Sequence, residues 1–225
     1  MPSIVLVRHA QASFGAADYD VLSDLGHEQV EAVARALDRR GMRVERIVSG
    51  SLRRQRDTAA PFAALAGLEV EVDPRWNEYE SDAVLVHHAE TDVRLDHAEG
   101  ARTVSSREFQ PLLEAALLDW IARGDDSPAD ETYPAFAARV RDALTAAADG
   151  LGSGATAVVC TSGGPIAAIC GRLLGAGPES LVTFNRVAIN TGMTKIAVGR
   201  GGMTLVSFNE HEHLEGEAAR LLTYR

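Results

Sequence analysis

The chain has 225 residues, of which 46% are hydrophobic, so it can form one α/β domain with a sizeable core and is too apolar to be disordered. Its 22 Lys and Arg residues and 32 Asp and Glu residues give a net charge of −10, which argues against nucleic acid or an anionic membrane surface as the partner. An anionic ligand would therefore have to be bound by local cations.

The first part of the chain predicts strands that alternate with helices. Residues 4–7 form a β-branched apolar run, which is typical of a strand buried on both faces. Ser23 can cap a helix with apolar residues at helical spacing, and Gly41 can end it. A strand over 47–49 and a helix over 52–66 are expected next. The remaining features of this part are Pro61, which must begin a new helix or kink the existing one, and a strand over 68–72.

The pattern changes between about residues 79 and 130. This stretch is largely polar, contains one clear helical run at 112–121 and carries no strand signal. We interpret it as a helical insertion over the sheet, and therefore over any active site at the edge of that sheet.

The last part returns to strands and helices. It predicts an amphipathic helix over 133–148, a second central strand over 156–160 and an apolar helix over 166–174. Strand candidates at 194–198 and 203–207 flank a glycine-rich turn and predict a hairpin at the sheet edge. The alternation as a whole predicts three layers, with helices on both faces of an open, mostly parallel sheet. Without an internal repeat or a long linker, the whole chain is expected to form a single domain.

The two cysteines and the N-terminal residues bear on the cellular compartment. Cys160 and Cys170 lie in apolar stretches without a second pair or a nearby histidine at a zinc-site spacing, so we expect buried thiols in a reducing compartment. Residues 1–8 lack a basic stretch followed by a long apolar run, and nowhere do about 18 apolar residues follow one another. A cytoplasmic protein without a membrane-spanning segment is expected.

Both central strands end in residues that suit an anion. In an open α/β sheet the ligand crevice lies at the carboxyl ends of the strands. The first strand ends in Arg8 and His9, and the second is followed by Ser162 and Gly163, where free backbone N–H groups and the positive end of a helix favour an anion. We therefore expect a phosphate between the two strand ends.

Five motifs, in a fixed order along nearly the whole chain, give this site a chemical identity. The strand that leads into Arg8, His9 and Ala10 resembles the Arg-His-Gly signature of the histidine phosphatase superfamily, also called phosphoglycerate mutase-like. The other matches are Leu22, Ser23, Leu25, Gly26 and Gln29 in the helix-opening motif; Ser51, Leu52, Arg54 and Thr58 around the second arginine; Arg75 and Glu78 around the acid; and Asn209, His213 and Leu214 in the C-terminal signature.

The resemblance implies a mechanism through a phosphohistidine. Neutral imidazole is a competent nucleophile near pH 7, so His9 can attack phosphorus. Arg8 and Arg54 offer planar, charged donor groups that match phosphoryl oxygens. Glu78 matches the general acid that protonates the leaving alkoxide and can then act as a base on water. We expect no metal ion and no other cofactor.

Neighbouring charged residues and other histidines have simpler interpretations. Arg53 and Arg56 lie on other faces of the expected helix, where solvated charge is the default. His213 is expected to make structural hydrogen bonds. His87 and His88 fall in the insertion and are expected at the surface or in a lid.

The second strand end departs from the family pattern. Most members have a histidine before the paired glycines, where this chain has Ser162. We expect Ser162 and Gly163 to bind the phosphoryl group, but a neutral hydroxyl bond is worth about 0.5–1.5 kcal/mol against roughly 1.5–3 for a charge-assisted one. This substitution predicts weakened activity, unless His87 or His88 supplies the missing donor. Ala10 in place of the family glycine is a milder departure.

Three functions fit these residues. The first is a phosphatase that hydrolyses a small phosphomonoester through phosphorylated His9, and the second is a mutase that returns the phosphoryl group to another hydroxyl of the same substrate. The third is a binding or regulatory protein for phosphorylated ligands on a weakened enzyme scaffold. We favour the phosphatase, because a mutase must shield its phosphoenzyme from water and nothing in the insertion indicates such closure.

Overall fold

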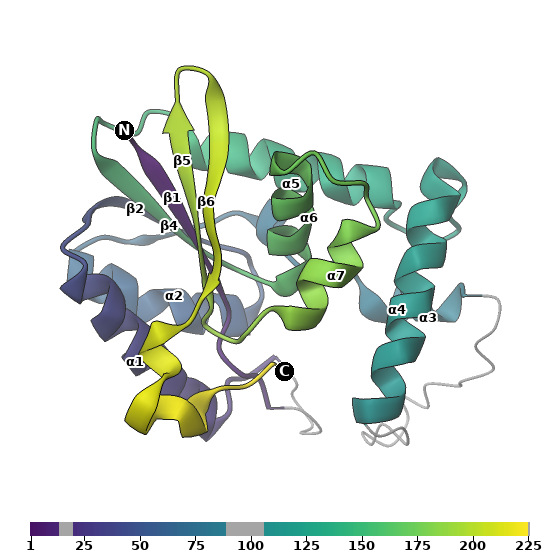
Figure 1. Ribbon diagram of the computed structural model, residues 1–225, viewed down its shortest axis with the longest axis horizontal. Coiled ribbons are helices and arrows are strands. Elements are labelled where there is room, and N and C mark those ends of the chain that lie inside the picture. The colour runs from purple at the N-terminus through teal and green to yellow at the C-terminus, as the bar shows by residue number, and fades with distance from the viewer. Residues whose placement is uncertain (14–19, 89–105, 225) are drawn as a thin grey trace.

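The described part of the chain, residues 1–13, 20–88 and 106–224, forms a six-stranded sheet with helices on both faces (Figure 1). In this computed structural model the strand order is β3-β2-β4-β1-β5-β6. The first four strands of that order are parallel to one another, and β5 is antiparallel to both of its neighbours, β1 and β6. The strands are β1 (Ser3–Arg8), β2 (Arg43–Ser49), β3 (Val70–Val72), β4 (Ala155–Thr161), β5 (Met193–Gly199) and β6 (Gly202–Glu210). The predicted α/β class and the edge hairpin are confirmed.

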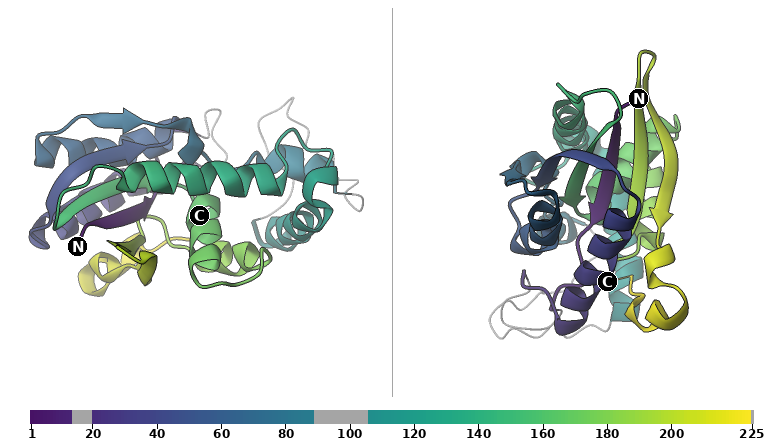
Figure 2. Two further views of the ribbon diagram at one scale, coloured as in Figure 1. Left: turned by 90° about the horizontal axis from the view of Figure 1, so that it is seen from above. Right: turned by 90° about the vertical axis from the view of Figure 1, so that its left-hand side faces the viewer.

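The helices form two layers over the sheet and a third group beyond its carboxyl end (Figure 2). They are α1 (Asp24–Arg39), α2 (Arg53–Ala66), α3 (Ser81–Val86), α4 (Ser106–Arg123), α5 (Tyr133–Ala148), α6 (Gly163–Leu173) and α7 (Ser180–Val187). Helices α1 and α2 cover one face, and α5 and α6 cover the other. Helices α3 and α4, which come from the predicted insertion, pack against each other beside the sheet rather than across it.

The central strands are buried on both faces, as their apolar runs predict. Ile4 and Leu6 of β1 belong to the core formed with α5 and α6, and Val5 and Val7 belong to the core formed with α1 and α2. All four side chains are fully buried. Because β1 and β4 lie in the middle of the sheet, with parallel pairing from Ser3 to Arg8, their carboxyl ends are held side by side.

The two residues predicted to begin and end the first helix, Ser23 and Gly41, do so in the structure. Ser23 caps α1 by accepting a hydrogen bond from the Gly26 N–H at 3.0 Å, and Gly41 follows the helix with a φ of 57°. Pro61 lies inside the continuous helix α2, so it does not begin a new helix, and the alternative of a kink stays a prediction. Helix α7 was not predicted, since it has only 8 residues and no side-chain hydrogen bond at its N-cap.

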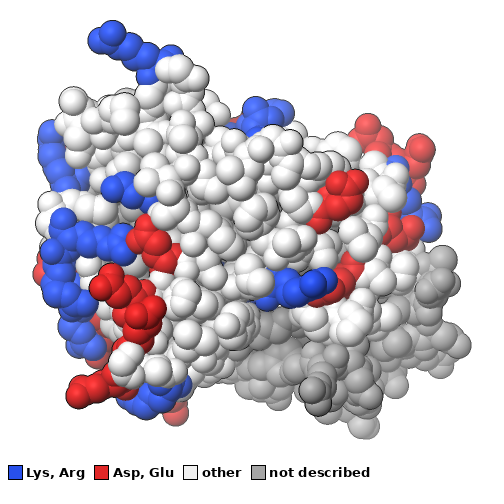
Figure 3. All heavy atoms as spheres, viewed as in Figure 1, with Lys and Arg blue, Asp and Glu red and all other residues white. Residues whose placement is uncertain are grey.

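Charge is distributed so that much of one face is neutral. In the view of Figure 3, the surface over β6 and α6 is largely uncharged, basic and acidic side chains lie side by side over α7, and most other charged side chains lie toward the margins. Among the helices of the described residues, none is long and apolar enough to cross a bilayer. On this face no broad positive field is present, so an anionic ligand depends on cations within its own site.

Candidate active site

The carboxyl end of β1 opens into a cavity of about 480 Å³ that is lined by all four residues predicted to be catalytic. Arg8 and His9 reach it from β1, Arg54 from the first turn of α2, and Glu78 from the segment before α3. The structure thus brings together side chains that lie up to 70 positions apart in the sequence.

His9 is held as a neutral imidazole with a defined tautomer. Its Nδ1 lies 2.8 Å from the Ala10 carbonyl oxygen, so Nδ1 carries the proton and donates it there. Its Nε2 accepts a hydrogen bond from Arg54 Nε at 3.3 Å. Burial, with the charges of Arg54 and Arg8 nearby, holds the pKa of His9 well below its usual value. His9 thus brings an unprotonated ring nitrogen, which has the chemistry of a nucleophile, to the wall of the cavity.

Arg54 is buried and is oriented by a carboxylate that the sequence did not single out. Its Nη1 donates to Asp20 Oδ1 at 2.7 Å, and Asp20 Oδ2 accepts from the Arg53 backbone N–H at 2.6 Å. Asp20 therefore caps α2 and fixes its first-turn arginine at the same time. No spacing rule links an aspartate to a helix that begins 33 residues later, so the sequence offers no signal for this contact.

Arg8 is oriented by main-chain oxygens from two later segments. Its Nη1 donates to the carbonyls of Ala188 and Tyr224, the latter at 2.6 Å. A Cβ added at Gly163 would lie 3.6 Å from Arg8 Nε and 2.2 Å from Asn185 Oδ1. The distance to Arg8 is an ordinary van der Waals contact, but a side chain at position 163 would displace the Asn185 amide.

Glu78 is enclosed at the N-terminus of α6. Its Oε2 accepts from the Gly164 N–H at 3.1 Å, and its Oε1 accepts from the Tyr79 N–H at 3.2 Å. Burial raises the pKa of Glu78 above its ordinary value, against these hydrogen bonds and the charges of Arg54 and Arg8, which lower it. A carboxyl group that keeps its proton to higher pH is suited to act as a general acid.

Ser162 and Gly163, which were predicted to bind phosphate, are both fully enclosed. Neither is among the described residues that line the cavity. The Ser162 hydroxyl accepts a hydrogen bond from Gln55 Nε2 at 2.8 Å, and the same amide donates to the Trp76 carbonyl at 3.2 Å. Gln55 thus fills the space beside the serine. The phosphate-binding role of Ser162 and Gly163 stays a prediction.

The other histidines of interest lie away from the cavity. His87 is exposed, and His88 Nδ1 lies 3.5 Å from Asp119 Oδ2. Neither is among the described residues that line the cavity, so neither is placed to supply the missing donor. His213 Nε2 lies 3.0 Å from Thr191 Oγ1, a contact of the structural kind expected for it.

A further set of contacts, which the sequence gave no reason to expect, anchors the main chain of His9. Asn190 Nδ2 donates to the His9 carbonyl at 2.9 Å, and Asn190 Oδ1 accepts from the Thr223 hydroxyl at 3.0 Å. Gln29 Nε2 in turn donates to Thr223 Oγ1 at 2.7 Å. The strand end, the loop after α7 and the last described residues are thus locked together around the nucleophile.

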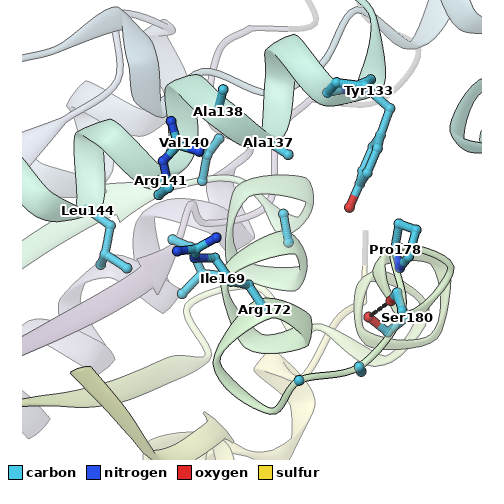
Figure 4. A pocket seen from close by; sticks show the side chains of 15 residues that line it. Tyr133, Ala137, Ala138, Val140, Arg141, Leu144, Ile169, Arg172, Pro178 and Ser180 are labelled. Atoms are coloured by element: carbon cyan, nitrogen blue, oxygen red, sulfur yellow. Dashed lines mark hydrogen bonds between the residues drawn. The ribbon is translucent and has the colours of Figure 1, made fainter. Parts of the chain in front are cut away.

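Metal-ligating clusters and a second pocket are the other possible ligand sites among the described residues. No group of three His, Cys, Asp or Glu side chains in this part of the chain is placed to hold a metal ion. A second pocket, of about 400 Å³, lies between α5 and the segment that joins α6 to α7 (Figure 4). Small and apolar side chains line most of it, Arg141 and Arg172 also line it, and none of the predicted site residues does.

Comparison with known proteins agrees with the motifs. A family model described as the histidine phosphatase superfamily (branch 1) matches residues 4–211. A glucosyl-3-phosphoglycerate phosphatase of Mycolicibacterium vanbaalenii is 32% identical over 185 residues, which cover 76% of this chain and 74% of that protein.

Solved structures share the fold. A mycobacterial glucosyl-3-phosphoglycerate phosphatase in complex with VO3 has a TM-score of 0.65 at 24% identity, with 93% of this chain and 99% of that chain covered. A phosphoserine phosphatase mutant from Entamoeba histolytica, in complex with phosphoserine, has a TM-score of 0.65 at 19% identity, with 96% of this chain and 100% of that chain covered. At these identities the structures show a common architecture.

Proposed function

Because this chain belongs to the histidine phosphatase superfamily, branch 1, we propose that it is a phosphatase that hydrolyses small phosphomonoesters through a phosphohistidine on His9. One observation carries this proposal: the His9 imidazole has its proton on Nδ1, and its unprotonated Nε2 accepts a hydrogen bond from Arg54 at the wall of the cavity. The curated relative, which is named for the hydrolysis of a phosphomonoester, supports the same reaction class.

The first step is transfer of the phosphoryl group to the enzyme. The lone pair of His9 Nε2 attacks phosphorus, and the bond from phosphorus to the ester oxygen breaks. Glu78, whose pKa is raised by burial, gives its proton to the departing oxygen, so that an alcohol leaves. Arg8 and Arg54 offset the negative charge of the phosphoryl oxygens during the transfer.

The second step is hydrolysis of the phosphoenzyme. Glu78, now a carboxylate, takes a proton from a water molecule whose oxygen attacks phosphorus, and the bond from phosphorus to Nε2 breaks. Inorganic phosphate leaves, and both His9 and Glu78 return to their starting protonation states. These residues balance the reaction without a metal ion, so we propose metal-independent catalysis.

The substrate is proposed to be a small polar organic phosphate. A cavity of about 480 Å³ is large enough for more than a phosphate, and polar side chains from α7 and the loop after it, including Asn185 and Asn190, lie along its wall. The buried free thiols of Cys160 and Cys170 favour a reducing compartment, and we propose the cytoplasm.

A second candidate function is favoured by the buried Ser162. A site with no histidine at this position could bind a phosphorylated ligand with little turnover, as a regulatory protein would. The test of both candidates is rapid acid quenching of the enzyme with 32P-labelled aryl phosphate, followed by peptide mapping. Acid-labile label on the peptide that contains His9 supports the phosphatase. Saturable binding of substrate without label or released phosphate would contradict it and favour the binding protein.

A further inference from the structure

The segment that carries Glu78 has an unusual source of hydrogen bonds. Residues 75–78 lie outside the strands, so their carbonyl oxygens have no partners in the sheet. All four carbonyls nevertheless accept hydrogen bonds from side chains. Three accept from Arg139 of α5, and the fourth, that of Trp76, accepts from Gln55 and Thr161. The path of this main chain is therefore dictated by side chains of other elements.

Arg139 is saturated by this arrangement. Its Nη1 donates to the carbonyls of Arg75 and Asn77, each at 2.8 Å, and its Nη2 donates to the Glu78 carbonyl at 3.3 Å. Nη2 also donates to Glu131 Oε2 at 2.8 Å, and Nε donates to Glu131 Oε1. A guanidinium group has five N–H donors, and each of the five has an acceptor here.

The pair formed by Arg139 and Glu131 is itself held firmly. The Arg139 Cζ lies 4.8 Å from the centre of the fully buried Phe136 ring, which supports the guanidinium. The Glu131 carbonyl accepts from Trp120 Nε1 at 2.8 Å. Phe136 also meets Tyr79, the residue after Glu78, edge to face with 5.9 Å between ring centres. Arg139 is thus fixed on the packed face of α5, and Glu131 is fixed in the segment just before that helix.

We propose that Arg139, held by Glu131, is a positioning residue that sets where the carboxyl group of Glu78 meets the leaving group. The proposal rests on the proposed role of Glu78 as the general acid. A partly exposed ion pair by itself stabilises a protein little. Three of the five donors, however, bind main-chain oxygens next to the acid rather than a carboxylate. A proton donor must lie within hydrogen-bond reach of the departing oxygen, and a displacement of about 1 Å can cost on the order of 10²-fold in rate.

The test uses three phosphate esters of similar size whose leaving groups differ: 4-nitrophenyl, phenyl and benzyl phosphate. Nitrophenolate departs without a proton, phenolate is intermediate, and benzyl alkoxide requires one. The quantity to measure is kcat/KM, because it reports on the steps up to departure of the alcohol. A defect in the general acid therefore grows along the series, whereas a general loss of structure lowers all three values alike.

The variant is Arg139→Lys, which keeps the charge but cannot make five directed hydrogen bonds. We expect kcat/KM to fall by about tenfold or more for benzyl phosphate and by less than about threefold for 4-nitrophenyl phosphate. Arg141→Lys is the matched control, because Arg141 lies on the same helix and forms its ion pair with the adjacent Asp142. It should leave all three values unchanged.

Glu78→Gln separates the failure of this proposal from failure of the proposed function. A graded loss in Glu78→Gln with an equal loss, or no loss, on all three esters in Arg139→Lys would overturn the role of Arg139 alone. An equal loss on all esters in Glu78→Gln would overturn the acid role and the positioning role together. If Arg139→Lys does not yield folded protein, Glu131→Gln carries the test. It should show the same gradient, and a flat series there would overturn the proposal.

Discussion

The two central strands end side by side, yet their ends are built differently. At the end of β1, Arg8 and His9 line the cavity together with Arg54. At the end of β4, Ser162 is fully buried against Gln55, and the Gly164 N–H at the start of α6 is bonded to Glu78. In the proposed function, the β1 half of the site (Arg8, His9 and Arg54) supplies the nucleophile and the positive charge, and the β4 half (Ser162, Gly164 and the Glu78 bonded to it) supplies the proton.

The difference shows how the two halves of a site can take different roles when Ser162 replaces the histidine of the family pattern. In the sequence, the glycines after β4 suggested that a helix N-terminus binds the phosphate directly. In the structure, one of those N–H groups donates to the Glu78 carboxyl group, and the proposed function leaves the arginines of the other half to neutralise the phosphoryl oxygens. Substitutions in either half should therefore have separable effects.

Loss of the nucleophile tests the β1 half most directly. His9→Ala should lower kcat on 4-nitrophenyl phosphate by at least about 10³-fold, because the covalent route is removed. Binding of inorganic phosphate, measured by titration calorimetry, should persist, since Arg8 and Arg54 remain. A His9→Ala enzyme that keeps more than about a tenth of its activity would show that the phosphoryl group is not carried on His9.

The second arginine tests whether the positive charge of this half is specific. Arg54→Ala should lower kcat/KM by about 10²-fold, because it removes charge-assisted hydrogen bonds to the phosphoryl group and a donor to His9. Arg53→Ala and Arg56→Ala are matched controls, since both side chains are exposed on the same helix. They should change kcat/KM by less than about twofold. Equal losses in all three would indicate a general electrostatic patch.

The strand and the residues of the β1 half could be predicted from the sequence, because they follow local sequence patterns. An apolar β-branched run predicts the buried strand, and the residues after it lie at the carboxyl edge of the sheet. Arg54 and Glu78 were placed by their motif positions rather than by physical reasoning, and the structure brings both to the cavity.

The β4 half could not be predicted to the same depth. Ser162 was expected to face the phosphate, but the structure packs it against Gln55, which lies 107 positions away. The contacts of Asp20, Asn190 and Arg139 are equally long-range. A hydrogen bond between residues that meet only in the folded chain leaves no period or spacing in the sequence, so such partners emerge only from the structure.

The pH dependence should show one limb from each half. Burial and the charges of Arg54 and Arg8 lower the pKa of His9. Protonation of His9 should therefore abolish activity only at pH values below its usual pKa of 6.5. Burial raises the pKa of Glu78 above 4.5, although Arg54 and Arg8 oppose the shift, so Glu78 stays protonated to higher pH. For benzyl phosphate, kcat/KM should fall by about tenfold per pH unit as pH rises through the pKa of Glu78.

Glu78→Gln provides the control for that profile. The second ionisation of the substrate, with a pKa of about 6, affects wild type and variant alike, so the ratio of the two profiles isolates Glu78. The alkaline limb should be absent from the variant and the acid limb retained. An alkaline limb that survives in Glu78→Gln would assign it to another group.

The smallest effects are expected at Ser162, where the β4 half departs from the family pattern. Ser162→Ala should lower kcat/KM at most about tenfold, the equivalent of one neutral hydrogen bond of 0.5–1.5 kcal/mol. Ser162→His alone should not place an imidazole where it can donate to the phosphoryl group, because the site is fully buried and Gln55 occupies the adjacent space. Overpacking should instead destabilise the protein by about 1–3 kcal/mol, visible as a lower Tm.

Removing Gln55 together with the serine should reverse this result. The double variant Gln55→Ala with Ser162→His opens room for an imidazole whose charged form can donate to the phosphoryl group, so kcat/KM for benzyl phosphate should rise about tenfold above wild type. Gln55→Ala alone is the control and should show no such gain. The double-mutant cycle then measures the coupling between the two positions. If Ser162→His alone is as stable and as active as the double variant, Gln55 does not occupy the space of the missing histidine. The end of β4 would then depart from the family pattern through Ser162 alone, and not through Ser162 and Gln55 together.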